Sequence, residues 1–79
     1  MVWRRRLSGL IKRSFSLVGH RTSVALEQEF WTALLRLAQA RGQSLSALVA
    51  SVDAARGPDR PLASALRVMA LAGDETPIG

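Results

Sequence analysis

Apolar and polar residues alternate along the stretch from Arg21 to Leu26. Successive side chains of an extended chain point to opposite faces, so Thr22, Val24 and Leu26 would share one face. This alternation predicts a β-strand with one face suited to a core. The other face is small and polar, with one long cation at its start, and consists of Arg21, Ser23 and Ala25.

Helical patterns follow this strand directly, so the sequence predicts one strand without a partner in its own chain. The N–H and C=O groups of an unpaired strand are costly to leave without hydrogen bonds. The simplest partner is the same strand in a second copy of the chain. Residues 14–17 also alternate before Gly19, and we interpret them as an extended lead-in or a short strand that extends the ribbon.

The first helical pattern opens with Glu27 and Glu29, because negative charge is favourable at the positive end of a helix dipole. A wide apolar stripe begins at Phe30 and Trp31, which we assign to the core. Gly42 is expected to end this helix.

Two further helices are expected. Ser44 has the side chain of an N-cap, and the helix after it is expected to end at Gly57. A third pattern runs from Leu62 to Met69, with Gly73 as its expected end. The predicted organisation is a basic, disordered arm over residues 1–13, a strand-and-two-helix core over 14–57, a third helix over 58–73 and a frayed tail over 74–79.

Length and composition favour a core that is shared between subunits. A chain of 79 residues forms one small domain at most, and such a core is marginally stable alone. The chain has no Cys, which excludes disulfides and Cys-based zinc sites and suits a reducing, cytoplasmic compartment. Oligomerisation therefore remains as the common means of stabilisation.

The formal net charge of +5 is concentrated at the start of the chain. The rest of the chain holds as many cations as acids, so attraction to a polyanion would come mainly from this arm. An organelle transit peptide and a membrane-surface segment are alternative interpretations, but no apolar run is long enough for a secretory signal or a membrane span. The cations of the arm are Arg4, Arg5, Arg6, Lys12 and Arg13.

The sequence does not favour catalysis. It has one His, no Cys and scattered acids, so it offers no paired carboxylates and no nucleophile beside a base. It also lacks a Gly-rich phosphate loop. We therefore expect no enzyme activity, no bound metal and no cofactor.

The strand RTSVALE, the helix FWTALLRLAQARG and the turn GQSLSALV occur in this order at tight spacing. Together they resemble the ribbon-helix-helix superfamily of bacterial DNA-binding proteins. The segments KRSFSLVGHRTSVALEQEFW and PLASALRVMAL resemble one bacterial subgroup of it. The resemblance implies a mainly α fold with one short β-strand, in an intertwined homodimer with an antiparallel two-stranded ribbon between subunits. It also implies a transcriptional regulator whose partner is duplex DNA.

By matching positions, the resemblance implies that Arg21, Ser23 and Ala25 read base edges in the major groove. Arginine can donate two hydrogen bonds to guanine, whereas alanine can only touch a thymine methyl group. The start of the second helix would hold a phosphate with its N–H groups. The expected phosphate contacts are Gln43, Ser44 and Leu45, with Lys12 and Arg13 from the arm and His20 beside the strand.

A second interpretation belongs to another class of function. Many small dimers of this fold type are antitoxins, in which a C-terminal segment wraps a toxin protein. The third helix, over residues 61–72, would serve that purpose here. The alternative for this helix, which we favour, is packing on the dimer itself, with no membrane partner.

Overall fold

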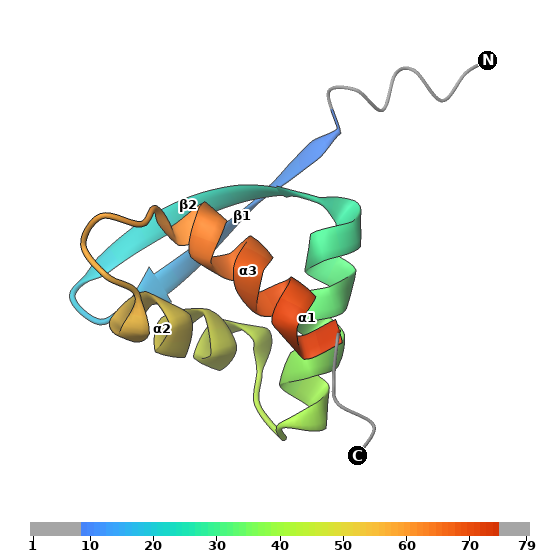
Figure 1. Ribbon diagram of the computed structural model, residues 1–79. Coiled ribbons are helices and arrows are strands. Elements are labelled where there is room, and N and C mark those ends of the chain that lie inside the picture. Colours follow the sequence, from blue (N-terminus) through green and yellow to red (C-terminus); the bar gives the residue numbers. More distant parts are fainter. Residues whose placement is uncertain (1–8, 75–79) are drawn as a thin grey trace.

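The computed structural model describes residues 9–74, and Figure 1 shows its three helices gathered on one side of a two-stranded hairpin. Residues 1–8 of the expected arm and residues 75–79 of the expected tail lie outside the described residues. The elements, in chain order, are β1 (Leu10–Leu17), β2 (His20–Glu27), α1 (Gln28–Ala40), α2 (Leu45–Ala55) and α3 (Leu62–Asp74).

The expectation of a single strand without a partner in its own chain is wrong. β1 and β2 pair antiparallel within the chain, with Leu17 opposite His20 and Leu10 opposite Glu27. β1 begins at Leu10, so residues 10–13 of the expected arm belong to the hairpin. The first strand therefore extends beyond the short lead-in over residues 14–17 that the sequence indicated.

The hairpin loop consists of Val18 and Gly19. Gly19 has a φ of 83°, a conformation that is unfavourable for residues with a Cβ. Gly19 thus lies in the turn that joins two strands of the same sheet.

The predicted ends of α1 and α2 agree closely with the structure. Gly42 has a φ of 67° just after α1, as expected for a residue that ends a helix. Ser44 caps α2, and its Oγ accepts a hydrogen bond from the N–H of Ala47 at 3.0 Å. Glu27 is the exception, because it is the last residue of β2 and the N-cap of α1, one residue before the helix begins.

α3 differs from its prediction at its end. The helix continues through Gly73 to Asp74, so Gly73 is not its stop. A Cβ at Gly73 would approach the two Cδ atoms of Leu37 to 3.0 Å. The glycine therefore permits close packing of α3 against α1.

All five elements contribute to one core. The inward face of the hairpin buries Phe15 and Val24, and Leu26 and Leu34 are completely inaccessible to solvent. Trp31 is buried as predicted, with its ring centroid 5.9 Å from that of Phe15. The other buried residues are Leu17, Ala38, Leu48, Val49, Val52, Ala65, Leu66 and Ala70. A single protomer thus buries the core face of its own strands.

Candidate nucleic-acid interface

The outward face of the hairpin brings together the three residues expected to read bases. Arg21 and Ser23 are exposed on β2, and Ala25 on the same strand is half-buried. Their neighbours in the strand, Val24 and Leu26, are buried on the opposite face. The predicted separation of a core face from a polar face is therefore confirmed for β2.

β1 adds residues to this face that the sequence interpretation missed. The register places Lys12 opposite Ala25, Ser14 opposite Ser23 and Ser16 opposite Arg21. Side chains directly opposite each other in a sheet lie on the same face. Lys12, Ser14 and Ser16 are all exposed, so the outward surface is two strands wide. The alternation of residues 14–17 indicated a strand in the sequence, but it did not show that this strand pairs with β2.

One hydrogen bond links the two strands across this surface. The hydroxyl oxygens of Ser14 and Ser23 are 3.0 Å apart. Such short contacts are typical of residue pairs that do not exchange backbone hydrogen bonds, because their side chains are closer. The two-residue loop predicts the same pattern, since the flanking residues Leu17 and His20 form a hydrogen-bonded pair and the two pair types then alternate.

This alternation determines where the backbone of β2 points. Arg21, Ser23 and Ala25 fall in the pairs that do not exchange hydrogen bonds with β1. Their N–H and C=O groups therefore point to the outer edge of β2. Within residues 9–74 the sheet contains only β1 and β2, so no further strand of this chain occupies that edge.

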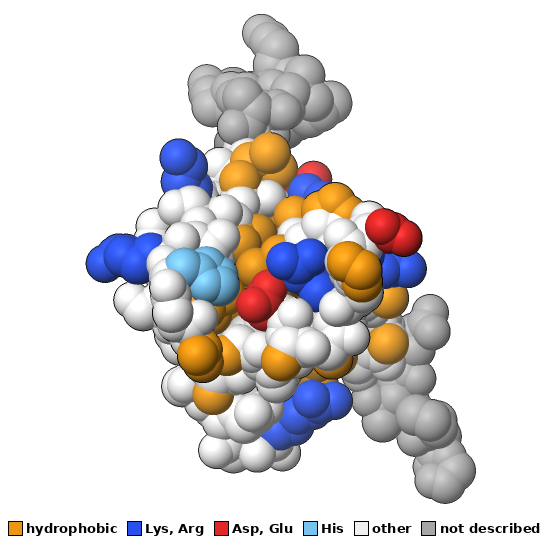
Figure 2. Space-filling view, turned by 90° about the vertical axis from the view of Figure 1, so that its left-hand side faces the viewer, with side chains coloured by type: hydrophobic (Ala, Val, Ile, Leu, Met, Phe, Trp, Pro, Cys, Tyr) orange, Lys and Arg blue, Asp and Glu red, His pale blue; other side chains and the backbone are white. Residues whose placement is uncertain are grey.

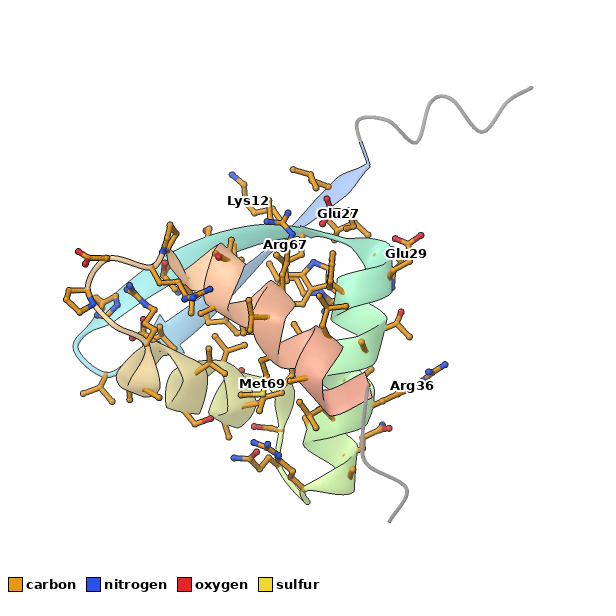
Figure 3. The ribbon with its side chains drawn as sticks, viewed as in Figure 1. Lys12, Glu27, Glu29, Arg36, Arg67 and Met69 are labelled. Carbon is orange, nitrogen blue, oxygen red and sulfur yellow. The ribbon has the colours of Figure 1, made fainter. Side chains whose placement is uncertain are left out.

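Lys12 and Arg13, both expected to contact phosphates, lie on different faces. Lys12 projects from the outward face and points away from the helices (Figure 3). Arg13 is opposite Val24 on the inward face, and its guanidinium carbon lies 5.4 Å from the Trp31 ring centroid. The indole Nε1 of Trp31 in turn donates a hydrogen bond of 2.8 Å to the carbonyl of Ile11. Arg13 therefore covers the core, and Lys12 alone of the two faces outward.

His20 is exposed at the start of β2, next to the hairpin loop. Figure 2 shows this histidine in pale blue at the surface, with Lys and Arg side chains along the same side of the view. The register places His20 opposite the buried Leu17, so it belongs to the inward side of the hairpin at its loop end and does not lie on the outward surface with Lys12.

The start of α2 is separate from the hairpin surface within one protomer. Figure 1 shows α2 beginning next to the α1–α2 connection, whereas β2 runs along the top of the view. The N–H of Gln43 donates to the carbonyl of Ala38 at 2.9 Å, and Leu45 is half-buried against the core. Ser44 is exposed, with its hydroxyl used for capping. The structure thus does not bring Gln43, Ser44 and Leu45 together with the strand residues.

The negative charge of Glu27, where β2 meets α1, is compensated by an arginine of α3. Glu27 accepts hydrogen bonds from Arg67 of α3, with the Arg67 Nη2 at 3.0 Å from its Oε1 (Figure 3). A backbone hydrogen bond at Glu27, together with the bond from Arg67, lowers the pKa of its carboxyl from the ordinary value of 4.5. The outward-facing cations Lys12 and Arg21 have no carboxylate partner among the ion pairs of the described residues.

Two other kinds of site were sought. Among residues 9–74 no three His, Cys, Asp or Glu side chains gather in a way that could hold a metal ion. None of the helices in this part of the chain has the length and apolar character needed to cross a membrane.

The family of the chain follows from a sequence comparison. A model of the Ribbon-helix-helix domain matches residues 10–73, most of the chain, so the chain belongs to this family. Ribbon-helix-helix domains are non-catalytic modules that bind DNA as dimers, typically in transcription regulation or as antitoxins. No curated protein and no solved structure gave a significant match.

Proposed function

We propose that the chain is a homodimeric transcriptional regulator that places the outward face of β2 in the major groove of duplex DNA. The observation that carries this proposal is the outward-facing row of exposed Arg21 and Ser23 and half-buried Ala25, on the strand face opposite the buried core residues. A major groove about 12 Å wide admits a two-stranded ribbon. The side chains on this row are short or cationic, as close approach to an anionic polymer requires.

The chemistry of each side chain suits a different base. The Arg21 guanidinium would donate to O6 and N7 of guanine, and the Ser23 hydroxyl would donate to or accept from a base edge. Ala25 has only a methyl group, which suits contact with thymine. Sequence preference would therefore depend mainly on Arg21.

The outer edge of β2 supports the dimer. The N–H and C=O groups that Arg21, Ser23 and Ala25 direct to this edge would find partners in an antiparallel β2 of a second copy. A two-fold axis at Ser23 would place Arg21 opposite the partner's Ala25. The long side chain of one protomer would then lie beside the smallest side chain of the other, and the ribbon between subunits would form although each β2 already pairs with β1.

Phosphate contacts would flank this row. Lys12 is exposed on the outward surface, and His20 is exposed at the loop end of the hairpin on its other side; both are proposed to contact phosphates. The contact at Gln43, Ser44 and Leu45 that the family resemblance implies depends on how the dimer arranges its helices around DNA, because these residues lie apart from β2 within one protomer.

The direct test is the binding of Arg21→Ala to a panel of duplexes, with Arg36→Ala as the matched control. Arg36 is an exposed arginine on α1 that points away from the hairpin (Figure 3). We expect Arg21→Ala to cost about 1–3 kcal/mol per contact and to relax preference at one base pair of each half-site. Ala25→Asn should add a preference for adenine. Equal effects of the two arginine substitutions on affinity and preference would contradict the proposal.

A second candidate function is protein binding through α3, as in an antitoxin. Val68 and Leu71 of α3 are 50% and 56% exposed, and a shallow groove of about 300 Å³ between α2 and α3 has a mainly apolar lining. The same helix buries Leu66 and Ala70 in the core, so it could not detach to wrap a partner without unfolding. A toxin partner encoded by a short neighbouring gene would copurify with the wild type and be lost with Leu71→Lys.

A further inference from the structure

The outward face of β1, like that of β2, carries small polar and cationic side chains. Its two serines have no role in the proposed function. Ser14 and Ser16 are exposed on the same side as Lys12, and the sheet register holds them beside the proposed base-reading row. Exposed strand positions commonly carry larger side chains with higher β-propensity than serine. Two serines and a lysine leave a shallow surface that presents hydroxyl and ammonium donors.

The expected width of the sheet in a dimer indicates where the outward face of β1 would lie relative to DNA. If the two β2 strands pair, as the proposed function requires, the strand order across the dimer is β1, β2, β2 and β1. Neighbouring strands are about 4.8 Å apart, so the two β1 strands would be about 14 Å apart. The major groove is about 12 Å wide. The central strands would therefore lie within the groove, while each β1 would meet a groove wall, where the phosphates are.

We propose that Ser14 and Ser16 donate hydrogen bonds to backbone phosphates at the walls of the major groove, alongside Lys12. A serine hydroxyl is a suitable donor to a phosphate oxygen, and such contacts fix the position of a protein on DNA without reading sequence. β1 thus has a positioning function, whereas β2 reads bases. This inference rests on the proposed function, including the pairing of β2 between subunits.

Ser16 offers the cleaner test of the two serines. Ser14 also bonds to Ser23, so its replacement would disturb a proposed base contact. Thr32 is an exposed hydroxyl residue on α1, outside the hairpin, and Thr32→Ala is the matched control. The full chain and both variants would be titrated with the preferred duplex and with duplexes in which single phosphates are replaced by neutral methylphosphonates.

The expected result is a coupling between one residue and one phosphate. Ser16→Ala should weaken binding about tenfold for each of the two contacts in the dimer, by a similar factor for every duplex sequence, since tenfold corresponds to about 1.4 kcal/mol, near the low end for a hydrogen bond to a charged group. At one phosphate in each half-site, a methylphosphonate should weaken binding of the wild type and Thr32→Ala but have little further effect on Ser16→Ala.

Two results would overturn the inference while leaving DNA binding intact. Identical methylphosphonate profiles for Ser16→Ala and Thr32→Ala would show that no phosphate is coupled to Ser16. A change of base preference in Ser16→Ala would instead show that β1 itself reads bases, as it would if the hairpin of one protomer entered the groove alone. Failure of the wild type to bind any duplex would contradict the proposed function itself.

Discussion

The inward face of the β1–β2 hairpin carries most of its large apolar side chains, whereas from Lys12 to Ser16 and from Arg21 to Ala25 the outward face carries hydroxyls, cations and one alanine. Both faces come from the same two strands and differ only in the parity of residue position. On β2, Val24 is 5% exposed, while its neighbour Ser23 is exposed at the surface. The position of a residue along the strand, odd or even, therefore determines whether its side chain stabilises the protomer or is available to DNA.

The largest expected effect comes from placing the same charge on each face in turn. Val24→Asp would bury a carboxylate without a partner, so we expect a loss of at least about 3 kcal/mol in the free energy of unfolding. Arg21→Asp on the outward face should leave the unfolding temperature nearly unchanged and abolish DNA binding by repulsion, because this exposed position would lie opposite an alanine of the second copy. Thermal unfolding followed by circular dichroism would measure both variants. Similar stabilities would contradict the assignment of the faces.

Trp31 tests how the inward face is held to the helices. Trp31→Ala would remove the ring contacts with Phe15 and Arg13 and the hydrogen bond to the Ile11 carbonyl, at a cost of about 3–5 kcal/mol. Trp31→Phe keeps most of the buried area and loses the indole donor, so about 1–2 kcal/mol is expected. Denaturant titration would separate the two variants, and equal losses would show that the hydrogen bond dominates.

Gly19 tests the register that aligns the two outward rows. Gly19→Ala forces a residue with a Cβ to adopt a φ near 83°, for which we expect a loss of about 1 kcal/mol. Gly57→Ala is the control, because a Cβ at Gly57 meets nothing within 4 Å and the residue has no positive φ. Urea unfolding would compare them, and an unaffected Gly19→Ala would mean that the loop does not need a left-handed residue.

The smallest expected effect concerns the ion pair at the end of the hairpin. Because folding lowers the pKa of Glu27, its carboxylate contributes stability at pH values above its unfolded pKa. That contribution is lost as the pH falls through the lowered, folded pKa. Glu27→Gln should therefore lower stability slightly at neutral pH, have little effect at pH values below the folded pKa, and flatten the pH dependence of stability in between. If the acid dependence of stability is unchanged in Glu27→Gln, other carboxylates are responsible for that dependence.

The sequence predicted β2 better than β1, and the reason is physical. In β2 the alternation continues without a break from Arg21 to Leu26, so its core face was evident. In β1 the pair Lys12–Arg13 has two cations in succession, which hid that Arg13 packs over Trp31 on the inward face. Long cationic side chains can cover apolar surface with their stems while the charged group stays in water. Polarity alone therefore did not identify the face.

Local sequence patterns predicted the ends of helices, but they did not predict features that depend on tertiary packing. Ser44 and Gly42 have capping functions that depend only on nearby backbone, and both were predicted. Gly73 was predicted to end α3, but the helix includes Gly73 and ends at Asp74, and the missing Cβ at Gly73 allows close packing against Leu37. The three base-contact candidates were placed correctly on one face, whereas Ser14 and Ser16 required the strand register.

The central claim is that the outward face of the hairpin is the surface that meets DNA. Amide and side-chain NMR signals of the isotopically labelled full chain, followed during addition of duplex DNA, would test it most directly. The account predicts that the largest shifts occur at Arg21, Ser23 and Ala25 and at the β1 residues opposite them. Little change is expected at Val68 and Leu71 of α3. Shifts concentrated on α3, with the hairpin signals unmoved, would contradict the claim.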